Sequence, residues 1–327
     1  MSLRQLPKVE LHLHLEGAAP PPLIRAMGQE KDINLSGVFA EDGSYVFKDF
    51  VDFLRVYEAA TEVLKTPEDF RRLVEAVLAE SASHGVIYTE MFVSPDFCGG
   101  ADLGAWQEFL HAMQDGADTA EKEHGIVSRG IVTCIRHLGG EQAKKTALCA
   151  AETAGDWIVG FGMGGDENQG TQQDFAYSFD LAKEAGLRLT THAGEWRGPQ
   201  EVRDALALGV ERIGHGVRSA EDAGLIQELR DRGTVLEVCP GSNVSLGVYP
   251  ALSHHPVHLL AEAGVAVTVS TDDPPFFHST MTKEYEGLEQ VFGWDQERFL
   301  GLARTSAKSA FCDATTQSTI LDRINAA

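Results

Sequence analysis

The chain repeats one local pattern seven times: an amphipathic stretch ends at a glycine, and a short run rich in β-branched residues follows at once. Glycine readily adopts the left-handed conformation that closes a helix, so it is the residue expected where a helix gives way to a strand. Successive glycines lie 23 to 40 residues apart, about the size of one helix-plus-strand unit. The seven are Gly85, Gly125, Gly155, Gly186, Gly209, Gly233 and Gly264. The pattern predicts alternating helices and strands.

The run after each glycine is short and largely apolar, as expected for a strand with both faces covered. An eighth strand is predicted over residues 8–15, without a preceding helix. Eight parallel strands alternating with helices make a (β/α)8 TIM barrel. A doubly wound open sheet is the alternative, but no GxGxxG follows the first strand. About seventy residues separate strands 1 and 2, which predicts a helical elaboration between them.

Residues 66–84 illustrate the predicted helices. Thr66 can cap the helix, Pro67 can occupy its first turn, and the apolar residues that follow recur at helical spacing. Pro199 and Pro256 are expected to open further helices in the same way. Since no linker or low-complexity segment interrupts the chain, we expect one domain over residues 1–327.

Charge and cysteine content exclude several classes of function. The chain has 27 Lys and Arg against 49 Asp and Glu, a net charge of −22, so we expect no nucleic acid and no membrane surface as a partner. No apolar run approaches the roughly 18 residues that a membrane span needs. The N-terminal segment lacks the pattern of a secretory signal, and the five scattered cysteines form no CxxC pair. These features favour a cytoplasmic protein and leave the oligomeric state open.

Polar residues end several of the predicted strands. In such a barrel the carboxyl ends of the strands meet at one mouth, where reactive residues lie. His12 and His14 are two residues apart in the first strand, so they share a face. His192 ends the fifth strand and Asp272 the eighth. Three imidazoles and a carboxylate suit zinc or a similar divalent ion, so we predict a metal site at these four residues.

Three further residues at the mouth are candidates for acid–base chemistry. Glu195 lies on the turn HAGE, where a dry pocket could keep its carboxyl protonated as a general acid; the alternative is a charge at a helix start. His215, between two glycines, is a candidate base, or else a fourth protein ligand of the metal or a buried hydrogen-bonded histidine. Asp273 is either a reacting group or a turn residue that supports Asp272.

A cluster of three histidines lies outside this pattern. His254, His255 and His258 stand near a predicted helix start, and their spacing fits no site at the end of a strand. We therefore expect these three side chains to be solvated.

Six segments between residues 6 and 274 resemble the signatures of the adenosine/adenine deaminase family of metal-dependent purine deaminases, with bacterial adenosine deaminases most similar. In chain order they are LPKVELHLHLEG, GGDE, THAGE, RIGHGV, LEVCPGSN and STDDP. Together they are highly specific, although each alone is not, and the resemblance covers essentially the whole chain.

The resemblance implies a role for each candidate. One zinc ion per chain would be held by His12, His14, His192 and Asp272. Glu195 would protonate purine N1, and His215 would activate or orient the attacking water. Asp273 would hold that water and N7, the Gly165 backbone would hold N3, and His14 and Glu16 would also contact the substrate. Two-metal relatives bridge their ions with a lysine that ends the fourth strand, and IVGFGMGGDE contains none, so one ion is expected.

The substrate expected from the resemblance is a purine nucleoside or base. Adenosine-specific members carry an aspartate that reaches the ribose at the position of Glu16, whereas HAGEW and IGHG look more like adenosine deaminases than the adenine branch. We expect hydrolysis of adenosine and 2′-deoxyadenosine to the inosine products and ammonia, with adenine to hypoxanthine as the alternative.

Two function classes outside purine deamination remain as alternatives. A non-catalytic purine- or metal-binding relative should have lost an acid, a base or a ligand, and every expected position is filled here. A metal hydrolase of another bond class, such as a phosphotriesterase, is disfavoured by the missing fourth-strand lysine and by the HAGE turn.

Overall fold

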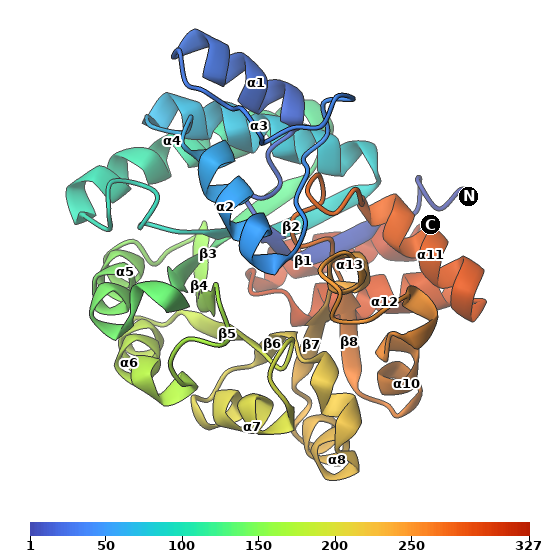
Figure 1. Cartoon of the computed structure of the whole chain (residues 1–327). Coiled ribbons are helices and arrows are strands. Elements are labelled where there is room, and N and C mark those ends of the chain that lie inside the picture. Colours follow the sequence, from blue (N-terminus) through green and yellow to red (C-terminus); the bar gives the residue numbers. More distant parts are fainter.

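A computed structural model describes all 327 residues as a ring of eight parallel strands surrounded by helices (Figure 1). The strands pair in chain order from β1 to β8, which confirms the predicted (β/α)8 barrel and excludes the open-sheet alternative. Their bounds are β1 Lys8–His14, β2 Val86–Val93, β3 Val127–Ile135, β4 Ile158–Gly164, β5 Arg188–Ala193, β6 Arg212–His215, β7 Val235–Val238 and β8 Ala266–Val269.

The ring closes between β1 and the segment that follows β8. Leu13 forms a parallel bridge with Asp272, and two backbone hydrogen bonds flank it. The amide of His14 donates to the carbonyl of Asp272 at 3.0 Å, and the amide of Asp272 donates to the carbonyl of His12 at 3.1 Å. The barrel is therefore closed at the carboxyl end of β1.

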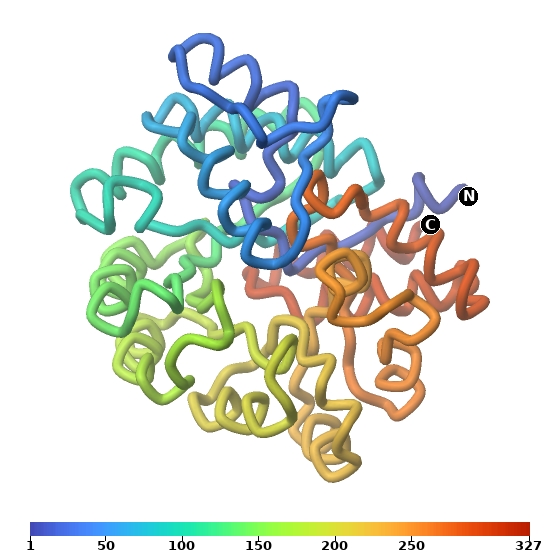
Figure 2. Tube along the Cα trace, in the orientation of Figure 1, coloured from blue at the N-terminus to red at the C-terminus, as the bar shows by residue number.

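Thirteen α-helices accompany the strands. They are α1 Pro21–Glu30, α2 Phe50–Thr61, α3 Pro67–Ser83, α4 Leu103–His124, α5 Gly140–Glu152, α6 Ala176–Glu184, α7 Pro199–Ala207, α8 Ala223–Arg232, α9 Pro240–Ser245, α10 Val257–Glu262, α11 Met281–Phe292, α12 Gln296–Ser309 and α13 Ala314–Asn325. The chain path in Figure 2 brings both termini to the same side of the molecule, where Met1 and Ala327 border one surface pocket. None of the helices combines the length and apolar character needed to cross a membrane.

Local sequence explains most helix boundaries. Thr66 and Asp69 form a reciprocal capping box at the start of α3, with Pro67 in the first turn as predicted. Six of the seven junction glycines have the positive φ expected between a helix and a strand. Gly155 is the exception. Helix α5 already ends at Glu152, and Gly155 lies in the short connection to β4, where its amide donates a hydrogen bond to the carbonyl of Ile158.

The long connection between β1 and β2 contains α1, α2 and α3, which confirms the predicted helical elaboration. Figure 1 shows α2 in front of the strands at the mouth of the barrel. Phe53 of α2 is buried and packs on Phe276 and Phe277, which follow β8. Aromatic contacts therefore hold the helical segment between β1 and β2 against the segment that follows β8.

The two faces of β1 carry different side chains. Leu11, Leu13 and Leu15 are fully buried in the main hydrophobic core, which extends to the surrounding helices. His12 and His14 point to the other face. Opposite them, a Cβ atom on Gly214 of β6 would come within 2.7 Å of the His12 ring, so this close approach needs glycine.

A buried ion network crosses the barrel interior below the histidines. Arg212 of β6 pairs with Glu90 of β2 at 2.7 Å and with Glu237 of β7 at 2.5 Å, and all three side chains are essentially inaccessible to solvent. The Arg212 guanidinium also lies over the Phe311 ring, 3.5 Å from its centroid. Because removing one member leaves charge buried without a partner, this network should be sensitive to substitution.

We predict that Arg212→Met lowers the free energy of unfolding by about 3 kcal/mol or more, because Glu90 and Glu237 lose their shared counter-ion. Arg188→Met is a matched control. Arg188 also lies over Phe311 and donates to a backbone carbonyl, but its partner Glu211 is exposed. That variant should lose only about 1 kcal/mol or less. Urea titration of both variants measures the difference, and equal losses would contradict the assignment.

Candidate active site

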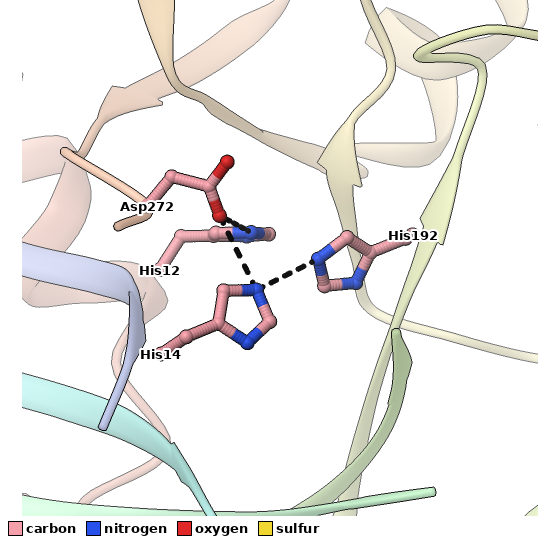
Figure 3. Close-up of side chains that lie close together, drawn as sticks. All are labelled: His12, His14, His192 and Asp272. Atoms are coloured by element: carbon pink, nitrogen blue, oxygen red, sulfur yellow. Dashed lines mark hydrogen bonds and ion pairs between the residues drawn. The ribbon is translucent and has the colours of Figure 1, made fainter. Parts of the chain in front are cut away.

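Four side chains converge where the barrel closes: His12 and His14 of β1, His192 of β5, and Asp272 just after β8 (Figure 3). One donor atom from each lies within 4.8 Å of the other three. His14 Nε2 is 3.2 Å from His192 Nε2 and 3.2 Å from Asp272 Oδ1, and His12 Nε2 is 3.3 Å from the same oxygen. The structure therefore brings together all four residues predicted as metal ligands.

Two of the rings are held by hydrogen bonds on their outer nitrogens. His192 Nδ1 donates to the carbonyl of Met163 at 2.7 Å, which leaves Nε2 unprotonated in the neutral ring and directed into the cluster. His12 Nδ1 lies 2.9 Å from a carboxylate oxygen of Glu237, which in turn is bound by Arg212. Such partners fix the ring orientation and tautomer that a metal ligand requires.

The donor set fits a divalent cation. His12 Nε2 is buried and faces the other three donors, with Asp272 Oδ1 at 3.3 Å. Burial lowers the pKa of His12, but the charges and hydrogen bonds of Asp272 and Glu237 outweigh burial and raise it to about 9. The cluster thus stabilises positive charge at its centre, and three imidazole nitrogens with one carboxylate oxygen are ligands that zinc prefers.

His215 and Glu195 lie beside this cluster. His215 ends β6 with a φ of 61°, and its Nε2 is 4.0 Å from Asp272 Oδ2. Its Nδ1 is 3.6 Å from a carboxyl oxygen of Glu195. Because a positive φ is rare for a residue other than glycine, the backbone at His215 is held in an unusual conformation next to the four convergent donors.

The surroundings of Glu195 favour the neutral form of its carboxyl group. Burial, followed by the negative charges of Asp272 and Glu167, raises the pKa of Glu195 well above its usual value. Its backbone is held by Glu167, whose carboxylate accepts hydrogen bonds from the consecutive amides of residues 194–197. Glu195 is therefore a rigidly placed carboxyl group whose surroundings favour the protonated form, as a proton donor requires.

Asp273, Glu16 and Gly165 complete the predicted set. Asp273 and Glu16 are both buried, and each has a carboxyl oxygen without a hydrogen-bond partner. Burial raises the pKa of Glu16 to about 7. Burial and the charge of Asp272 raise the pKa of Asp273 well above its usual value. Gly165 has a φ of 98°, and a Cβ atom there would meet the His137 ring at 2.9 Å.

One cavity joins these residues. It is lined by His14, Glu16, Gly165, His192, Glu195, His215, Asp272 and Asp273, while His12 lies buried beneath it. Phe50, Phe53, Leu54 and Tyr57 of α2 form its apolar cover. The cavity combines an apolar wall with unpartnered carboxyl oxygens and a site for a cation, which suits a flat molecule with several hydrogen-bonding atoms.

Several residues that shape the site were not predicted from the sequence. Glu237 holds His12, Glu167 holds the Glu195 turn, and Ser242 of α9 donates to Asp272 at 2.6 Å. Asn243 contacts both Glu195 and His215. All four lie in the LEVCPGSN and GGDE segments, so the family resemblance already marked their positions. The partner that each side chain contacts, however, is determined only when the barrel closes.

The expectation of three solvated histidines is wrong for one of them. His255 is buried, and its Nε2 lies 3.1 Å from Asn243 Oδ1. His255 lies between the turn Leu252–His254 and α10, and both of its ring nitrogens find buried partners there, Nδ1 at the amide of Val257 and Nε2 at Asn243 of α9. His254 is exposed as expected, and His258 is partly buried and accepts a hydrogen bond from the Trp294 indole.

Comparisons with known proteins agree with this arrangement. Residues 7–327 match the family model described as adenosine deaminase. A curated adenine deaminase of Rhizobium rhizogenes is 45% identical over 320 residues, which cover 98% of this chain and 99% of that protein. The crystal structure of an adenine deaminase from Arthrobacter aurescens is 30% identical, with a TM-score of 0.90 and 98% of each chain covered.

A third relative shares the fold at lower identity. It is an amidohydrolase from Burkholderia ambifaria, solved with bound zinc. It is 24% identical with a TM-score of 0.85, and the match covers 99% of this chain and 94% of that one. The family model matches residues 7–327, and the relatives at 41 to 45% identity are named as purine deaminases. Both findings support purine deamination as the activity. The chain belongs to the adenosine deaminase family.

Proposed function

We propose that this protein is an adenine deaminase that converts adenine and water to hypoxanthine and ammonia, with residues 1–327 acting as one catalytic unit and one zinc ion per chain. The observation that carries the proposal is the convergence of three imidazoles and a carboxylate beside a buried neutral carboxyl group. In the net reaction, water supplies the oxygen that bonds to purine C6, and the C6 amino group leaves as ammonia.

Adenine is preferred to adenosine as the substrate because of the relatives. Proteins 41 to 45% identical over nearly the whole chain are named adenine deaminases, and so is the Arthrobacter aurescens structure. These names favour adenine, which the sequence offered as the alternative substrate, over adenosine, which was the main expectation. Glu16 supports the same choice, because it replaces the shorter aspartate of adenosine-specific members and shares the cavity wall with Tyr57 of α2.

Zinc would be held by His12, His14, His192 and Asp272. When bound, a zinc ion supplies Lewis-acid activation of water near neutral pH. The protein contributes the orientation of the donors, through Met163 at His192, Glu237 at His12 and Ser242 at Asp272. These partners reduce the reorganisation needed when a cation binds.

Glu195 would donate a proton to purine N1. Its raised pKa keeps the proton on the carboxyl group until the ring nitrogen is in place, and protonation of N1 makes C6 more electrophilic. His215 would activate or orient the attacking water from the side of Asp272. Asp273 would hold that water and N7, and the backbone of Gly165 would hold N3.

His14 and Glu16 would complete the substrate contacts at the cavity wall. Both line the cavity, and the unpartnered carboxyl oxygen of Glu16 is available for a hydrogen bond. Because an unsatisfied buried polar atom is costly, a substrate that pairs with it gains affinity over one that does not.

The substrate prediction is tested by ultraviolet absorbance of the purified protein with adenine, adenosine and 2′-deoxyadenosine in parallel. We expect kcat/KM for adenine to exceed that for either nucleoside by at least about tenfold, since the nucleosides must place a ribose against the cavity wall. Comparable or faster turnover of adenosine would restore the nucleoside as substrate. If none of the three is deaminated with zinc present, the proposed function is wrong.

Glu195→Gln tests the proton donor. Glutamine can still accept the hydrogen bond from Asn243 but cannot deliver a proton, so kcat should fall by at least about 10²-fold while bound zinc is unchanged. Steady-state kinetics and metal analysis give both readouts. Glu184→Gln, at an exposed position of α6, is the matched control and should keep full activity. Near-normal turnover by Glu195→Gln would remove Glu195 from this role.

Metal removal tests the ligand set. Dialysis against a chelator should abolish deamination, and about one equivalent of zinc per chain should restore it. His192→Ala should lose bound zinc as measured by elemental analysis, whereas His111→Ala, at an exposed position of α4, should retain it. A requirement for two ions per chain, or full zinc binding by His192→Ala, would be inconsistent with the proposed site.

A further inference from the structure

Asn243 lies between the two groups proposed for acid–base chemistry. Its Nδ2 atom is 2.8 Å from Glu195 Oε1 and 3.3 Å from His215 Nδ1. On the other side, its Oδ1 atom is 3.1 Å from His255 Nε2. All four side chains are buried, and these contacts form a continuous hydrogen-bonded chain that ends at the active-site cavity, which Glu195 and His215 line.

A backbone amide at the outer end of this hydrogen-bonded chain fixes which atom donates and which accepts in each of its hydrogen bonds. The amide of Val257 donates to His255 Nδ1 at 3.2 Å, and an amide N–H cannot accept. His255 Nδ1 therefore carries no hydrogen. Burial lowers the pKa of His255 to about 3, so the ring stays neutral and its single hydrogen lies on Nε2. That N–H donates to Asn243 Oδ1.

The same direction continues into the active site. With its oxygen facing His255, the Asn243 amide presents its NH2 group to Glu195 Oε1 and to His215 Nδ1. Because an amide NH2 only donates, both of those atoms must accept. In a neutral His215 ring the hydrogen is then on Nε2, the nitrogen that faces Asp272. A proton on Glu195 is correspondingly carried by Oε2.

We propose that Asn243 and His255 are positioning residues that fix the hydrogen-bonding direction of His215 and Glu195. His215 then presents an Nε2–H donor to the cavity, and Glu195 presents its proton on Oε2. This inference rests on the proposed function and decides between the two roles left open for His215. A neutral His215 that accepts a proton at Nε2 would need its own hydrogen on Nδ1, where the Asn243 N–H group already lies. His215 therefore orients the attacking water.

Nitrogen-15 NMR of the histidine-labelled zinc enzyme tests the direction without turnover. Long-range proton–nitrogen correlations distinguish the two neutral tautomers, and His215 and His255 can be assigned by single substitutions. We expect both rings to be Nε2–H tautomers. An Nδ1–H tautomer at either ring would overturn the proposal, whether or not the protein deaminates adenine.

Kinetics of two substitutions at one position test the consequence. His255→Leu removes the donor to Asn243 and should lower kcat by at least about tenfold, with KM changed less than about threefold and bound zinc unchanged. His255→Gln can accept from the Val257 amide and donate to Asn243, so its kcat should stay within about threefold of wild type. His254→Leu, the same change at the exposed neighbour, should have no effect.

The outcomes separate this inference from the proposed function. If wild type deaminates adenine and His255→Leu matches it, or if His255→Gln falls as far as His255→Leu, the positioning role is wrong and His255 serves only packing. If wild type has no deaminase activity, the proposed function fails while the tautomers measured by NMR still decide the direction of the chain. If His255→Leu does not fold, His255→Gln and the NMR measurement carry the test.

Discussion

The closure of the barrel and the convergence of the four histidine and aspartate donors depend on the same interaction. Two backbone hydrogen bonds join β1 to the segment after β8, and they involve His12, His14 and Asp272, three of the four convergent residues. Asp272 adopts a φ of 68° there, a conformation that aspartate tolerates better than most residues. Because the pairing that closes the barrel involves His12, His14 and Asp272, barrel closure also brings these three donors together. The fourth donor, His192, comes from β5 on another side of the barrel.

Negative charge is the second constraint on the site. Asp272, Asp273, Glu195 and Glu16 share one cavity, and four carboxyl groups cannot all be ionised in so buried a place. Burial would raise the pKa of Asp272, but hydrogen bonds from His12 and His14 outweigh burial and hold it well below its usual value. The pKa values of the other three carboxyl groups are raised. These opposite pKa shifts favour an ionised Asp272, which can bind a cation. They favour the neutral form of the other three carboxyl groups, which can then donate hydrogen bonds or protons to the ring nitrogens of a substrate.

How much the sequence predicts depends on whether the determining contact is local. The strands, the Thr66 cap and most helix ends follow from neighbouring residues, so they were predicted closely, with Gly155 as the exception. The four convergent donors were predicted because strand ends meet at one mouth in any such barrel. Glu237, Asn243 and His255 act through contacts between different units of the barrel, and nothing in their immediate sequence reveals those partners.

The central claim is that three imidazole nitrogens and one carboxylate oxygen of this chain surround a single cation. X-ray absorption at the zinc edge of the reconstituted protein tests it most directly. The account predicts a first shell of nitrogen and oxygen atoms only, at about 2.0–2.2 Å, with the outer scattering of about three imidazole rings. Sulfur scattering at about 2.3 Å, which would bring in Cys239 near His215 and Asp272, or fewer than two imidazoles, would contradict it.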